Sequence, residues 1–207
     1  MAFLPILIEM ENMPCLVAGG GAIALHKVEK LLEHGADITV VAPDICKEIE
    51  KLPVKIFKRC AEASDCEGMA LVADATGDRN AEDLLSKACS KRHIPYICAG
   101  NGELCTAILP AVYSSGRTVV AVSSKGASPA ASAWLRDYLA EKVPENTDAI
   151  LDRMADVRAV AKASLDSQPV RREFMHDCLK KMTDTGEIIS DNEIKKMLKK
   201  YLQEEEK

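Results

Sequence analysis

A glycine-rich turn near the start of the chain carries the clearest chemistry in the sequence. Gly19-Gly20-Gly21-Ala22-Ile23-Ala24 satisfies the pattern G-x-G-x-x-G/A. In this pattern the first glycine makes a tight turn, the second lets a pyrophosphate approach the backbone, and the last small residue packs a helix closely on a strand. The free amides at the helix N-terminus hold the phosphate charge. We therefore predict that Gly19 and Gly21 contact a dinucleotide, with a glycine turn that binds nothing as the alternative.

Two later turns carry further candidates for cofactor contacts. Asp44 follows the second apolar run, where an acidic residue binds the ribose 2′-hydroxyl of NAD, so NAD is favoured over NADP. Asp44 could equally cap the helix that begins near it. Thr76 and Gly77 follow a later run, at the strand end where ligands of open α/β sheets collect, and an ordinary turn is again the alternative.

Alternating strands and helices must position these turns. Apolar runs predict strands near 15–18, 38–42, 54–57, 69–75 and 94–98, and helical spacing predicts helices over 22–35 and 80–93. Gly35 is expected to cap the first of these helices. Parallel strands with intervening helices predict an α/β fold with a Rossmann-like doubly wound sheet.

The pattern changes after about residue 112. A strand over 118–124 and a helix over 130–143 are followed by helices only, near 147–164, 169–182 and 190–204. Ser190 and Glu193 fit a capping box at the start of the last helix. We therefore expect a first domain over 1–112, a connecting segment over 113–145 and a small helical domain over 146–207.

Composition excludes several classes of protein. The chain has 207 residues, 47% of them hydrophobic but only 4% aromatic, and a net charge of −5. Few aromatic rings and no basic excess disfavour nucleic acid as a partner. The sequence lacks a run of 18 apolar residues and a secretory-type leader, so we expect no membrane partner and a cytoplasmic location. The spacing of the eight cysteines fits no metal knuckle, so we expect buried free thiols and no metal site.

Several motifs together resemble those of the precorrin-2 dehydrogenases, a family that includes the N-terminal module of siroheme synthase. They are Leu4-Pro5-Ile6, the glycine turn with Ala24 and Lys27, Thr39–Pro43, Glu103-Leu104-Cys105, Pro110 and Ser123–Pro129. The resemblance implies a Rossmann domain, a dimerisation segment over 113–145 and a C-terminal helical domain. It also implies a homodimer that oxidises precorrin-2 to sirohydrochlorin with NAD, followed in some members by iron insertion.

The resemblance also implies positions for both ligands. Cofactor contacts fall on Ala22, Ile23, Pro43 and Asp44. The substrate segment corresponds to Ser123–Pro129, with Lys125 in place of a family glycine. Because precorrin-2 carries several carboxylates, its site needs cations and hydrogen-bond donors. The expected substrate contacts are Ser124, Lys125, Ser128 and Arg117.

One departure from the family pattern concerns catalysis. The family usually carries an aspartate, its leading candidate for a general base, at the position that Gly100 occupies here. The catalytic residue is therefore unknown, with Asn101 and Glu103 as candidates, although an asparagine cannot accept a proton at neutral pH.

The missing carboxylate leaves three hypotheses. Positioning of NAD alone could suffice. Another group could replace the base, namely Glu103, Asp78, His26 or His93. The chain could instead bind NAD or a tetrapyrrole without turnover. We expect weak or absent chelatase activity, and Gly100→Asp is the substitution that this interpretation suggests.

Overall fold

A computed structural model describes residues 3–205, and the contacts within it divide the chain into two units. The first unit contains the residues up to Leu109 together with Ser123–Ser128, and the second contains Pro110–Val122 and the chain from Pro129 onward. The elements of the first unit are β1 (Pro14–Ala18), α1 (Ala22–Leu32), β2 (Asp37–Val41), α2 (Lys47–Glu50), β3 (Lys55–Phe57), η1 (Ala63–Cys66), β4 (Leu71–Asp74), α3 (Arg79–Arg92), β5 (Tyr96–Cys98) and η2 (Gly102–Leu104). Those of the second are β6 (Ala111–Ser115), β7 (Thr118–Val122), α4 (Pro129–Ala140), α5 (Thr147–Ser164), α6 (Gln168–Thr185) and α7 (Asp191–Glu205).

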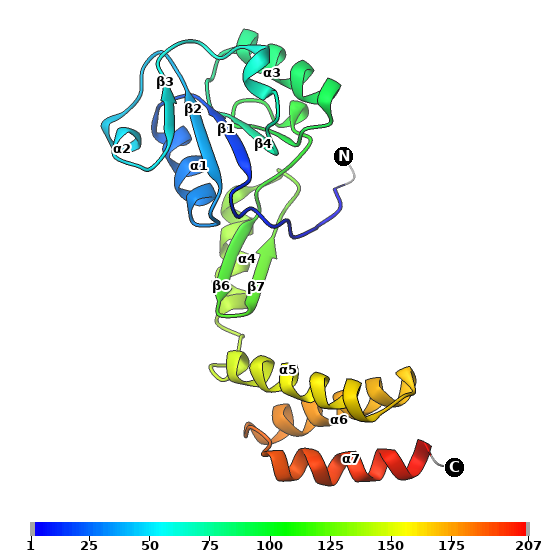
Figure 1. Cartoon of the computed structure of the whole chain (residues 1–207). Coiled ribbons are helices and arrows are strands. Elements are labelled where there is room, and N and C mark those ends of the chain that lie inside the picture. Colours follow the sequence, from blue (N-terminus) through cyan, green and yellow to red (C-terminus); the bar gives the residue numbers. More distant parts are fainter. Residues whose placement is uncertain (1–2, 206–207) are drawn as a thin grey trace. The chain divides into compact units, whose positions relative to one another are not determined.

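The first unit is built on a five-stranded parallel sheet with the order β3-β2-β1-β4-β5 (Figure 1). The central strand β1 pairs on both sides, so that Leu16 aligns with Thr39 of β2 and with Val72 of β4. Because the chain starts at the centre and builds outward in both directions, loops converge at the carboxyl ends of β1, β2 and β4. The predicted Rossmann-like doubly wound sheet is confirmed.

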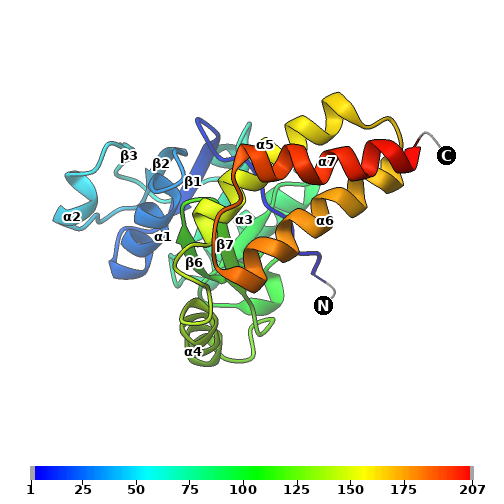
Figure 2. The ribbon, with the colours of Figure 1, turned by 90° about the horizontal axis from the view of Figure 1, so that it is seen from below.

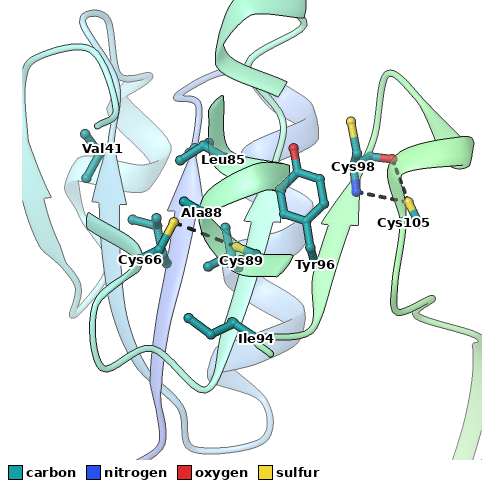
Figure 3. Close-up of a cluster of buried hydrophobic side chains, with 12 residues drawn as sticks. Val41, Cys66, Leu85, Ala88, Cys89, Ile94, Tyr96, Cys98 and Cys105 are labelled. Carbon is teal, nitrogen blue, oxygen red and sulfur yellow. Dashed lines mark hydrogen bonds between the residues drawn. The ribbon is translucent and has the colours of Figure 1, made fainter. Parts of the chain in front are cut away.

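Both faces of this sheet are covered by helices. Alternate residues of each strand point to opposite faces, as a sheet buried on two sides requires. The helices α1 and α2 pack on the face that includes Val17 and Val40, whereas α3 and η1 pack on the face that includes Leu16 and Val41. Figure 3 shows the second of these clusters, in which Tyr96 lies fully buried beside α3.

One local prediction in the first unit is wrong, and three short elements were missed. Helix α1 ends at Leu32 with Glu33 as its C-cap, so Gly35 is not the cap. Gly35 instead has a φ of +75°, which lets the chain turn back toward β2. The short helix α2 and the turns η1 and η2 were not predicted, because each is too short to show a period.

The second unit begins with an antiparallel hairpin, in which Ser115 pairs with Thr118 around the turn at Gly116. The strand β6 was not predicted, because two of its five residues are serines and it shows no apolar run. Helix α4 contacts both strands of this hairpin.

Three helices follow, α5, α6 and α7, each in contact with the other two (Figure 2). Their core includes Phe174, Met182 and Tyr201, all at most 2% exposed, so these helices are held by side-chain packing. The capping box at the start of α7 is confirmed: Glu193 accepts from the Ser190 amide at 2.8 Å, and the Glu193 amide donates to Ser190 Oγ at 3.3 Å.

Within residues 3–205, none of the helices is long and apolar enough to cross a membrane.

Candidate functional site

The glycine turn lies at the carboxyl end of β1, between the loops that follow β2 and β4. Gly19 has a φ of +116°, and a Cβ at this position would lie 2.5 Å from the carbonyl oxygen of Ala75. Its amide donates to the Val41 carbonyl at 3.0 Å, and the Ala75 amide donates to the Ala18 carbonyl at 2.7 Å. Only glycine fits this conformation and this close approach. The tight turn expected at Gly19 is present.

The other two glycines of the turn have different surroundings. A Cβ on Gly20 would collide with the carbonyl oxygen of Asp44, and the Gly20 carbonyl accepts the Cys46 amide at 2.8 Å. A Cβ on Gly21 would meet nothing within 4 Å. Gly20 is therefore required by the protein itself, a requirement that the motif leaves unspecified, whereas the space beside Gly21 is available to a ligand.

The N-terminus of α1 fits a phosphate group. Gly21 is the N-cap and adopts an extended conformation without a side chain that could cap the helix. The first turn is Ala22-Ile23-Ala24-Leu25, whose leading amides have no intrahelical acceptor and face this end of the helix. Ala24 is fully buried against the sheet, as the motif predicts. The residues therefore fit a nicotinamide dinucleotide, which supplies a hydride acceptor when bound.

The acidic candidate after β2 lies beside this turn. Pro43 and Asp44 are both exposed, and the Asp44 backbone packs on Gly20. The N-cap of α2 is Cys46, so the alternative that Asp44 caps this helix is wrong.

A buried carboxylate organises the turn after β4. Asp74 is 1% exposed; its Oδ1 accepts the Thr76 amide at 2.8 Å and the Thr76 hydroxyl at 2.7 Å. The Tyr96 hydroxyl donates to Asp74 Oδ2 at 2.7 Å, and burial together with this carboxylate raises the pKa of Tyr96. Thr76 thus holds the turn through Asp74, and Gly77 follows it with a φ of +67°. Sequence reasoning missed the roles of Asp74 and Tyr96, which are far apart in sequence.

The loop after β5 contains the catalytic candidates. Asn101 is the N-cap of η2, and its Oδ1 accepts the Glu103 amide at 3.0 Å. The Glu103 side chain is exposed. A buried acid that sequence reasoning missed, Glu82 on the first turn of α3, lies against Gly100. A Cβ on Gly100 would collide with Glu82 Oε1, so an aspartate there would not fit without displacing Glu82.

The expected substrate segment clusters with the first unit, as does the glycine turn. The Ser128 amide donates to Ser124 Oγ at 2.9 Å, and Ser124 Oγ donates to the Ser128 carbonyl at 3.0 Å. Lys125 lies at the tip of this turn, exposed, with a φ of +54°. A lysine there adopts a backbone conformation that favours the family's glycine.

The fourth expected substrate contact, Arg117, lies in the second unit. Its amide donates to Asp148 Oδ1 at 3.1 Å, and its Nε donates to Asp152 Oδ1 at 2.5 Å. The guanidinium thus forms an ion pair with Asp152 of α5.

Comparison with known proteins then gives the family. A family model described as "Putative NAD(P)-binding" matches residues 6–111, the part that carries the parallel sheet and the glycine turn. The chain belongs to this NAD(P)-binding family. The prediction of a nicotinamide dinucleotide as the cofactor of the fold is thereby confirmed.

Individual proteins extend the similarity. Siroheme synthase from Methylococcus capsulatus is 32% identical over 178 residues, which are 84% of this chain and 38% of that protein. Siroheme synthase from Nitrosospira multiformis is 35% identical over 183 residues, 84% of this chain and 39% of that protein. The chain thus spans less than two fifths of these relatives.

A solved structure matches nearly the whole chain. SirC, precorrin-2 dehydrogenase, superposes with a TM-score of 0.70 at 20% identity, covering 97% of this chain and 100% of SirC. This similarity shows that the two share a fold, including the helices that follow the NAD(P)-binding domain. The resemblance found in the sequence motifs is confirmed.

The cysteines of this NAD(P)-binding protein are free thiols. Six are buried, as predicted, whereas Cys46 is partly exposed and Cys60 is exposed. Cys66 and Cys89 approach to 3.8 Å between their sulfur atoms across η1 and α3, as Figure 3 shows. The Cys98 amide donates to Cys105 Sγ at 3.1 Å. These cysteines contribute to the packing around α3 and β5.

Proposed function

We propose that this protein oxidises precorrin-2 to sirohydrochlorin with NAD as the hydride acceptor. The observation that carries the proposal is the open space beside Gly21 at the N-terminus of α1, in a chain of which 97% shares the fold of SirC, precorrin-2 dehydrogenase. The similarity to siroheme synthases over 84% of the chain supports the same tetrapyrrole chemistry.

The cofactor in this proposal lies across the carboxyl ends of β1, β2 and β4. Its phosphates bind the amides of the first turn of α1, and its ribose hydroxyls bind Asp44 beside Pro43. The turn at Thr76 and Gly77 lies beside the rest of the cofactor. The proposed cofactor contacts are Gly19, Gly21, Ala22, Ile23, Pro43, Asp44, Thr76 and Gly77.

The substrate in this proposal is held through its carboxylates. The exposed ammonium of Lys125 and the turn formed by Ser124 and Ser128 belong to the same unit as the cofactor turn, which supports their role. Arg117 remains a proposed contact; its binding of a substrate carboxylate would replace the Asp152 ion pair.

The proposed active form is a homodimer formed through residues 113–145. Helix α4 carries large apolar side chains that are exposed, including Trp134 at 67% and Tyr138 at 49%, whose rings stack at 6.2 Å. An exposed patch of this kind favours an interface. Sedimentation of the purified protein as a monomer would contradict this part of the proposal. A cytoplasmic location belongs to the same proposal.

The decisive assay is incubation of purified protein with precorrin-2 and NAD⁺. The expected result is formation of the sirohydrochlorin absorption spectrum together with NADH, both followed in the same cuvette. Gly100 motivates a second candidate, a protein that binds NAD or a tetrapyrrole without turnover. Unchanged precorrin-2 alongside measurable binding would favour that candidate. Chelatase activity, tested by adding Fe²⁺ or Co²⁺ to sirohydrochlorin, is expected to be weak or absent.

A further inference from the structure

A buried carboxylate fills the space beside Gly100. Glu82 is 5% exposed, although its neighbour Asp83 has a side chain that is 64% exposed. An ideal Cβ on Gly100 would fall well inside 3.0 Å of Glu82 Oε1 and 3.3 Å from its Cδ. The carboxylate of Glu82 therefore occupies the position where a side chain at residue 100 would begin.

The glycine at position 100 is explained by this neighbour. Gly100 has a backbone conformation open to any L-residue, unlike Gly77 or Gly126, whose φ values are +67° and +88°. Neither a turn nor a positive φ requires glycine here. The missing side chain instead leaves room for Glu82, so the two residues form a complementary pair.

The oxygens of the Glu82 carboxylate lie at the protein surface. Among residues 3–203, whose side chains the structure describes, the Glu82 carboxylate forms no hydrogen bond or ion pair. None of the fully occluded side-chain oxygens in that range lacks a partner. The Glu82 oxygens must therefore reach the protein surface, even though the rest of the side chain is buried. Its backbone carbonyl oxygen lies 3.2 Å from the Tyr96 hydroxyl, whose proton is donated mainly to Asp74, so α3 and β5 approach each other at this point.

The other titratable groups on the elements around it are less suited to accept a proton. Asp74 on β4 is already engaged by three hydrogen bonds. Burial raises the pKa of the Cys98 thiol on β5, and the Glu82 charge raises it further. The Tyr96 pKa is raised by burial and by Asp74. The Cys98 thiol and the Tyr96 hydroxyl thus remain protonated at neutral pH, whereas the Glu82 carboxylate has lone pairs available.

We propose that Glu82 is the proton acceptor of the oxidation, supplied from α3 instead of from position 100. This role rests on the proposed function. In the oxidation one C–H bond of the substrate breaks with transfer of a hydride to the nicotinamide. A second C–H or N–H bond breaks, its electron pair forms the new double bond, and its proton passes to Glu82 and then to water.

The test moves the carboxylate between the two positions. The variants are Glu82→Gln, Glu82→Ala, Gly100→Asp, and the double variant Glu82→Ala with Gly100→Asp. The matched control is Asp83→Asn, the adjacent exposed acid. Each is measured for turnover of precorrin-2, for NAD binding by fluorescence titration, and for its melting temperature without ligands.

Loss of a general base slows turnover about 100-fold or more. We expect this loss in Glu82→Gln, with NAD binding within about twofold of wild type. Gly100→Asp alone should lower the melting temperature because it collides with Glu82, and the Glu82→Ala background should remove that loss. The double variant should turn over precorrin-2 at least about tenfold faster than Glu82→Ala alone. Asp83→Asn should match wild type.

The outcomes separate this role from the proposed function. Turnover by wild type with no loss in Glu82→Gln overturns the role of Glu82 alone. Absence of turnover in wild type overturns the proposed function and, with it, this role. A Gly100→Asp variant that melts at the wild-type temperature contradicts the complementary pair itself, independently of any activity.

Discussion

Removal of one hydroxyl tests the network that holds the turn after β4. Tyr96→Phe keeps the buried ring but removes the donor that reaches Asp74 Oδ2 at 2.7 Å. Asp74 is 1% exposed, so water cannot readily replace this donor. Hydrogen bonds to charged groups contribute about 1.5 to 3 kcal/mol, and we expect the free energy of unfolding to fall by that amount at pH 7.

The second unit offers a matched control. Tyr201 is also buried, and its hydroxyl donates to Asp177 Oδ2 at 2.6 Å, but the Asp177 side chain is 42% exposed. Water can solvate that carboxylate after the hydroxyl is removed, so Tyr201→Phe should cost no more than about 1 kcal/mol. Both variants are compared by urea denaturation followed by circular dichroism. If Tyr96→Phe loses no more free energy of unfolding than Tyr201→Phe does, burial of the acceptor carboxylate does not set the strength of these hydrogen bonds.

The same hydroxyl makes stability depend on alkaline pH. Because the folded chain keeps the Tyr96 proton while the unfolded chain releases it near pH 10, its contribution is fully present below pH 10 and is lost as pH rises above it. From pH 9 to pH 11 this loss is about 1.4 kcal/mol. Wild type should therefore lose about that much more stability over this range than Tyr96→Phe does. Parallel pH curves for the two proteins would contradict the raised pKa.

Two further substitutions test the turns of the first unit. Gly21→Ala adds a methyl group to space that is empty within 4 Å. We therefore expect NAD affinity to fall at least about tenfold, while the free energy of unfolding changes by less than about 1 kcal/mol. Unchanged affinity in a fluorescence titration would argue against a phosphate at this position. Lys125→Gly removes the backbone strain of a lysine at a φ of +54°, so it should raise the free energy of unfolding by about 1 kcal/mol in urea denaturation. It should also weaken precorrin-2 binding, because a cation is lost. A destabilised variant would contradict the strain.

The central fold could be predicted from sequence because its signals are local. The turn at Gly19, the alternation of apolar runs, and the helical spacing over α5, α6 and α7 all lie within short windows. The strand β6 was missed because its signal is weak without its partner. The turn at Gly116 next to β7 was the available indication of a hairpin.

The interactions that organise the site depend on pairs that are distant in sequence. Gly20 packs on the Asp44 carbonyl, and Tyr96 donates to Asp74 across 22 residues. No periodicity or motif places such pairs side by side, because their contact arises only when neighbouring strands align. Sequence patterns therefore located the cofactor turn but could not show what holds the adjoining loops.

The pair of Glu82 and Gly100 shows how a sequence departure can be misinterpreted in isolation. The absence of an aspartate at position 100 suggested a lost carboxylate, which Gly100→Asp would restore. In the structure, the carboxylate of Glu82, 18 residues earlier, lies in the space that the new aspartate side chain would need. Asp83, adjacent in sequence and identical in charge, faces solvent and pairs with Lys87. The face of α3 on which an acid lies thus decides whether it approaches residue 100, and the absence of a side chain at Gly100 leaves room for the Glu82 carboxylate.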